Sequence, residues 1–133
     1  MILLAFLLLF LVACGVKDSK TFTFSEETEN WSATLKVTQT SNDFENQELV
    51  LEYTGDDVKS VGEIAYRIDS VGSFDGNGVT LDDNGVLIVN GEANPTNAKV
   101  TENTKVEVTV KWNNNSESFK LDMDMKIEVK QKE

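Results

Sequence analysis

The strongest constraint on the fold is a two-residue alternation of apolar and polar side chains. It runs, with one interruption in the second segment, through residues 31–38, 49–53, 64–69, 106–112 and 119–129. A helix would scatter these apolar residues around its circumference, whereas a β-strand places all of them on one face. The sequence therefore predicts half-buried strands over these segments.

Turn-forming residues separate the strands. Glycine, asparagine and aspartate gather at residues 54–57, 75–78, 82–85 and 113–116, and these residues tolerate the positive φ angles of tight turns. With further strands at 21–24 and 85–93, the sequence predicts an all-β fold of about seven strands. We expect an antiparallel β-sandwich of the immunoglobulin-like kind.

The core and the last strand allow more specific predictions. Trp31 and Trp112 are the expected large core residues, since tryptophan buries the most apolar surface. A core disulfide is excluded because the chain has one cysteine. The alternating run that ends the chain is long for one strand, so we expect a bulge or bend near Asp122–Met125.

A different pattern occupies the start of the chain. Residues 2–12 are all apolar, which is shorter than the roughly 20 residues of a membrane span and within the roughly 7–15 of a signal peptide. The run ends in Leu11-Val12-Ala13-Cys14, which resembles the lipobox of bacterial lipoprotein signal peptides, although no Lys or Arg precedes it. The resemblance implies a diacylglycerol on the Cys14 thiol and signal cleavage between Ala13 and Cys14.

The same resemblance divides the chain. It implies a signal peptide at 1–13, the lipidated Cys14 with a short tether at 14–20, and one domain at 21–133, anchored by lipid on the extracytoplasmic face of the cell membrane. The segments Glu29-Asn30-Trp31, Lys111-Trp112-Asn113 and Glu117-Ser118-Phe119 are similar to those of small Bacillus-type lipoproteins. Those relatives bring no mechanism with them.

Charge and composition narrow the function. The formal net charge is −11, from 12 basic and 23 acidic residues, so nucleic-acid phosphates and anionic lipid headgroups repel the domain. The chain has no histidine, which removes the usual base for a serine or cysteine nucleophile and the usual zinc ligands. We expect neither an enzyme nor a cofactor.

The sequence leaves two weaker hypotheses of metal binding open. Asp75, Asn77, Asp82 and Asp83 lie in oxygen-rich segments that could bind calcium, although ordinary turns use the same residues. Met123 and Met125 could bind a soft metal, but core packing is the better interpretation.

The function predicted from the sequence is that of a membrane-anchored binding module for an unknown ligand. Membrane lipid is the partner through Cys14, and an envelope protein or wall component is the expected second partner. The alternatives are an accessory structural component of an envelope complex and a small calcium-binding surface domain.

Overall fold

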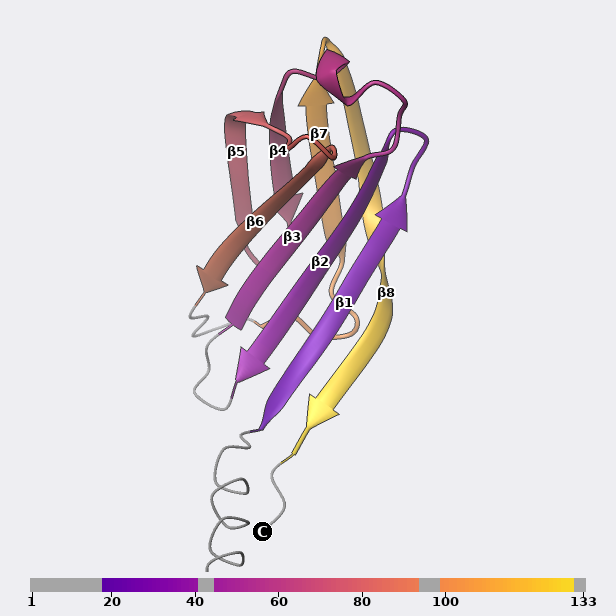
Figure 1. Cartoon of the computed structure of the whole chain (residues 1–133). Coiled ribbons are helices and arrows are strands. Elements are labelled where there is room, and N and C mark those ends of the chain that lie inside the picture. Colours follow the sequence, from indigo (N-terminus) through magenta and orange to yellow (C-terminus); the bar gives the residue numbers. More distant parts are fainter. Residues whose placement is uncertain (1–17, 41–44, 94–98, 131–133) are drawn as a thin grey trace, which may run out of the picture.

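The computed structural model describes residues 18–40, 45–93 and 99–130, and the rest of the chain lies outside the described part. The described residues form eight strands and one short 3-10 helix (Figure 1). In chain order these are β1 (Ser19–Glu27), β2 (Trp31–Thr40), β3 (Glu45–Tyr53), η1 (Val58–Ser60), β4 (Glu63–Asp69), β5 (Ser73–Thr80), β6 (Val86–Ala93), β7 (Val106–Trp112) and β8 (Asn115–Val129).

All eight strands belong to one antiparallel sheet that is nearly closed into a barrel. The strand order is β5-β4-β7-β8-β1-β2-β3-β6. The first half of β8 pairs with β7 and its second half pairs with β1, so this strand belongs to both halves of the sheet. The all-β antiparallel prediction is confirmed, while the immunoglobulin-like sandwich is not confirmed by this strand order.

The strand absent from the sequence prediction is β5. The turn predicted at residues 75–78 is wrong, because all four residues lie inside β5, where Asp75 and Gly76 pair with Arg67 and Tyr66 of β4. The glycine-rich stretch is accommodated by a register shift in the β4–β5 pair, with Gly78 at φ +69°. The turn itself lies at Ser70–Gly72, where the Ser70 amide donates to the Gly72 carbonyl at 2.8 Å.

The predicted turns at 82–85 and 113–116 are confirmed. Gly85, at φ +81°, donates its amide to the Asp82 carbonyl at 2.9 Å. Asn113 and Asn114 connect β7 to β8 at φ angles of 45° and 63°. Two consecutive positive φ angles define the hairpin turn that matches strand twist, and asparagine tolerates them better than most residues.

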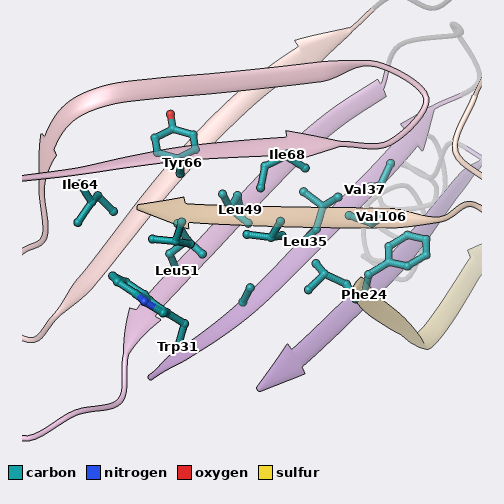
Figure 2. Packing of buried hydrophobic residues seen from close by; sticks show 14 of the residues in the cluster. Phe24, Trp31, Leu35, Val37, Leu49, Leu51, Ile64, Tyr66, Ile68 and Val106 are labelled. Atoms are coloured by element: carbon teal, nitrogen blue, oxygen red, sulfur yellow. The ribbon is translucent and has the colours of Figure 1, made fainter. Parts of the chain in front are cut away.

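The core fills the space between the two halves of the sheet. Figure 2 shows Leu35, Leu49 and Leu51 pointing into this space from β2 and β3. Trp31 and Trp112 are both buried, as predicted, and their rings meet edge to face with centroids 5.3 Å apart. Such aromatic pairs add about 0.5–1.5 kcal/mol beyond the area they bury.

The long strand β8 contains the predicted bulge. Phe24 of β1 pairs with Met123, but the preceding residue Thr23 pairs with Met125, so Asp124 has no opposite residue. The Ser25 hydroxyl donates to the Asp124 carboxylate. A bulge inserts one residue into a strand, and side chains alternate with a period of two, so the faces of β8 exchange at this point.

The exchange turns the last apolar residues of β8 outward. Met125, Ile127 and Val129 pair with Thr23, Thr21 and Ser19, and directly opposed residues share one face of a sheet. Their exposed fractions are 53%, 50% and 39%. The prediction that Met123 and Met125 pack in the core is therefore wrong, and Met123 is also partly exposed. We call Met125, Ile127 and Val129 the β8 apolar stripe.

Candidate functional site

The sheet has two ends, and the start of the domain lies at one of them. Ser19, the first residue of β1, pairs with Val129 near the end of β8. Strand β1 therefore begins within the predicted tether at 14–20 and includes its last two residues, Ser19 and Lys20. Ala13 and Cys14, the predicted cleavage and lipidation residues, lie outside the described residues. We call this the proximal end.

The opposite end, which we call the distal end, consists of residues 28–30, 54–62, 81–85 and 113–114. Backbone hydrogen bonds join these connections. The Thr54 amide donates to the Asn30 carbonyl at 2.8 Å, and the Tyr53 amide donates to the Gly85 carbonyl at 2.9 Å. The Asn113 side-chain amide also donates to the Ser60 carbonyl. The distal connections therefore lie together at one end of the sheet and are linked by hydrogen bonds (Figure 1).

A hollow of about 530 Å³ opens at this distal end. Its lining combines apolar, acidic and basic residues with one glycine and one threonine. The lining residues are Val58, Lys59, Gly62, Thr80, Leu81, Asp82 and Asp83. We call it the distal hollow.

The calcium candidates fall into two separate places. Asp82 and Asp83 border the distal hollow, whereas Asp75 and Asn77 border a different hollow of about 370 Å³ that is lined by β4, β5 and β7. Asp82 is engaged in its own turn, since one carboxylate oxygen accepts from the Asn84 and Val86 amides at 2.9 Å each. Within the described ranges, no group of three or more acidic, histidine or cysteine side chains is placed to hold a metal ion.

Asp75 belongs instead to an ion-pair cluster around Arg67. The Arg67 guanidinium lies 3.1 Å from Asp69 and 3.8 Å from Asp75. The hydrogen bond to Asp69 is the main cause that raises the pKa of Arg67. Burial, and next the charge of Asp75, raises the pKa of the neighbouring Tyr66. These charged groups are solvated, so the cluster contributes little stability, and it holds no nucleophile with an adjacent base.

The sequence predictions missed a buried carboxylate, Glu45, whose exposed fraction is 1%. Its Oε1 accepts from the Gln47 side-chain amide at 2.7 Å, and its Oε2 accepts from Gln39 at 3.0 Å and from the Val100 amide at 3.2 Å. Gln39 also donates to the Val100 carbonyl at 2.6 Å. This network fastens the segment before β7 to the proximal ends of β2 and β3.

The signal for Glu45 was present in the alternation. Glu45 and Gln47 share the inward parity of Leu49 and Leu51 on β3. Polar residues at inward positions are rarely buried without partners, so this parity pointed to a hydrogen-bonded cluster. The partner Val100 lies 55 residues away in the chain, and no local pattern identified it.

Comparison of the chain with protein-family models, with curated proteins and with solved structures gives no match. In the part of the chain that the structure describes, no helix has the length and apolar character needed to cross a membrane.

Proposed function

We propose that this protein is a lipid-anchored, extracytoplasmic binding module that presents its distal end to a partner. The anchor is the lipobox-like Leu11-Val12-Ala13-Cys14, which ends five positions before β1 begins at Ser19. One observation carries the proposal: β1 begins at the proximal end of the sheet, and the distal hollow lies at the other end. A strand rises about 3.3 Å per residue, so the distal end would stand roughly 30 Å from the start of β1.

The distal hollow suits recognition better than catalysis. Val58 and Leu81 supply apolar surface, while Lys59, Asp82 and Asp83 supply charges that would fix the orientation of a bound group. Ligand sites commonly combine a mainly apolar lining with a few polar groups. The expected occupant is a small ligand or a projecting side chain of an envelope protein or wall component.

The finer classification of the fold is part of the same proposal. The turn of the sheet at β8 brings two halves face to face over one core, an arrangement in keeping with the sandwich architecture of many surface-binding domains. For the alternatives, an accessory structural role and calcium binding, no feature of the described residues provides specific support.

Lipid attachment is tested by replacing the sole cysteine. We expect Cys14→Ser to abolish incorporation of an alkyne-labelled fatty acid and to release the protein from the membrane fraction. The double variant Cys14→Ser/Ser19→Cys is the control, since it keeps a thiol close by but outside the lipobox. Equal labelling of the double variant and the wild type, or membrane retention of Cys14→Ser at unchanged mobility, would refute the anchor.

Distal binding is tested by photo-cross-linking in intact cells. A photoreactive residue at Lys59, which borders the distal hollow, is compared with one at Lys120, which is equally a surface lysine but lies on β8. We expect a discrete product from position 59 that is absent at position 120 and weakened by Cys14→Ser. Products of equal size and yield from both positions would exclude a distal binding site.

A further inference from the structure

We infer that the β8 apolar stripe is a lipid-contact surface that lies against the outer leaflet of the membrane. This inference rests on the proposed anchor at Cys14 and extends it, because it assigns a second membrane contact within the folded domain. Three observations support it, namely the outward placement of the stripe, the protection of the neighbouring strand edge, and the position of the stripe beside the anchored end.

The stripe is a continuous apolar row. Met125, Ile127 and Val129 occupy alternate positions on one strand and face the same side. Residues two apart on a strand lie about 6.6 Å from one another, so the row is roughly 13 Å long. Three of the six large apolar side chains exposed in the described residues belong to this row. Large apolar side chains gathered in this way mark a contact surface, whereas scattered ones do not.

The strand edge beside the stripe is built against pairing with another strand. Among the described residues, no strand pairs with β8 beyond Leu121 on the side that β7 occupies earlier. Asp124 forms a bulge there, and Lys126 and Glu128 point to the inner face, opposite Phe22 and Lys20. The Lys126 ammonium lies 5.8 Å from the centroid of the Phe22 ring. Bulges and inward-pointing charges are the devices that prevent edge-to-edge association.

A second copy added through this edge is therefore disfavoured, although the edge is long enough to pair. The apolar face itself carries no such protection. An occupant that lies flat on the row and needs no backbone hydrogen bonds fits it better, and a lipid surface is such an occupant.

The chain that precedes the domain places this row near the bilayer. Val129 pairs directly with Ser19, and Ile127 pairs with Thr21. Ser19 follows Cys14 by five positions, and five residues span at most about 18 Å. Lipid on Cys14 would thus hold the lower end of the stripe within reach of the headgroups, and a tilt of the domain would bring the whole row down.

Local charge permits this contact in spite of the acidic domain. Among residues 19–21 and 125–130, the charged residues are Lys20, Lys126, Lys130 and Glu128. Lys20 and Lys130 lie 4.0 and 3.7 Å from Glu128. Lys126 also lies 4.0 Å from Glu102, so these basic and acidic groups nearly balance, and the acidic excess of the chain opposes docking of a broad face more than contact along this row.

A single introduced thiol tests the inference in the lipidated full-length chain. Cys14 is blocked by its lipid, so Ile127→Cys carries the only free thiol for a bimane label. Ile88→Cys is the matched control, because Ile88 on β6 is also an outward isoleucine, with an exposed fraction of 58%. Across the sheet, Ile88 pairs with Val50, Val50 with Thr34, and Thr34 with Ser25, whereas Ile127 pairs with Thr21. Ile88 therefore lies four residues farther from the proximal end than Ile127.

Both labelled proteins are reconstituted in phosphatidylcholine vesicles with or without dibrominated acyl chains. A side chain at the boundary of headgroups and acyl chains lies about 5–10 Å deep, within reach of the bromine atoms, so emission at position 127 should fall to about half or less. Emission at position 88 should be unchanged.

The outcomes separate the two proposals. If the proteins with an intact Cys14 neither incorporate the fatty-acid label nor bind vesicles, the anchor is refuted. Vesicle binding with equal, weak quenching at both positions would leave the anchor intact and refute the lipid contact. Shielding of position 127 from aqueous iodide without bromine quenching would also overturn the inference, and would assign the stripe to a protein partner or a second copy.

Discussion

Replacement of Glu45 by alanine should be among the most destabilising changes in this domain that leave the apolar core intact. The carboxylate accepts hydrogen bonds from Gln39, Gln47 and the Val100 amide. Gln39 keeps a second acceptor in the Val100 carbonyl. The Gln47 side-chain amide and the Val100 N–H lose their acceptor, and both residues are buried.

The magnitude follows from these two donors. A buried donor left without an acceptor costs about 1–3 kcal/mol, and the gain from no longer burying a carboxylate offsets part of the sum. We expect Glu45→Ala to lower the free energy of unfolding by about 3 kcal/mol. Glu45→Gln should cost about 1 kcal/mol, because its carbonyl still accepts from one side and Gln47 can reverse its amide. A domain with 5–15 kcal/mol of stability remains folded in both cases.

Urea denaturation measures this difference, and the fluorescence of the buried Trp31 and Trp112 reports unfolding. Glu48→Ala is the control, since Glu48 lies on the same strand with its side chain exposed, and such surface changes stay within about 0.5 kcal/mol. Hydrogen exchange at the Val100 amide should accelerate in Glu45→Ala. Equal midpoints for the two alanine variants would refute the reasoning, because they would mean that water satisfies the freed donors.

Three further predictions concern β5, its turn and the adjacent strand. A Cβ at Gly76 would lie 2.5 Å from the Tyr66 ring, so Gly76→Ala should cost about 1–3 kcal/mol in urea denaturation, whereas Gly91→Ala on the other edge strand, with open space around it, should not destabilise. Asp82→Ala removes two turn hydrogen bonds and should lower the free energy of unfolding by about 1–2 kcal/mol. Asp83→Ala is the control and should leave it unchanged; equal losses in the two variants would contradict the turn assignment. Burial, and next Asp75, raises the pKa of Tyr66, so the unfolded chain ionises first and stability should fall as the pH rises above about 10. Tyr66→Phe should weaken that fall, and an unchanged pH profile would argue against a desolvated phenol.

Most of the strands were predictable because period-two alternation is a local property. Residues 106–112 were predicted as a strand and form β7 with the same bounds. The exception, β5, reads as a turn because Asp-Gly-Asn-Gly combines the residues that favour positive φ. Only Gly78 of the four adopts such an angle, and pairing with Arg67 and Tyr66 of β4 holds Asp75 and Gly76 in the strand. Tertiary pairing therefore overrode a local preference that carries little energy.

Pairing partners and buried polar contacts are harder to predict from the sequence than strand positions. A sandwich and a continuous sheet produce the same alternation in every strand. They differ in which strands pair with the first and the second half of β8. The partner of Glu45 is likewise fixed only when the segment before β7 reaches β2 and β3. Such contacts depend on long-range register, which single-sequence patterns do not contain.

The bulge at Asp124 shows how one residue decides the character of a surface. The alternation through residues 119–129 is regular, and a straight strand would bury Met125, Ile127 and Val129 beside Leu121. The single unpaired residue reverses the parity, so Lys126 covers Phe22 and the apolar residues face out. The sequence alone predicted the bulge but kept the apolar row in the core. Since exposure of three large apolar side chains forgoes several kcal/mol of burial, the outward row is better explained by contact with another surface than by the stability of the isolated domain.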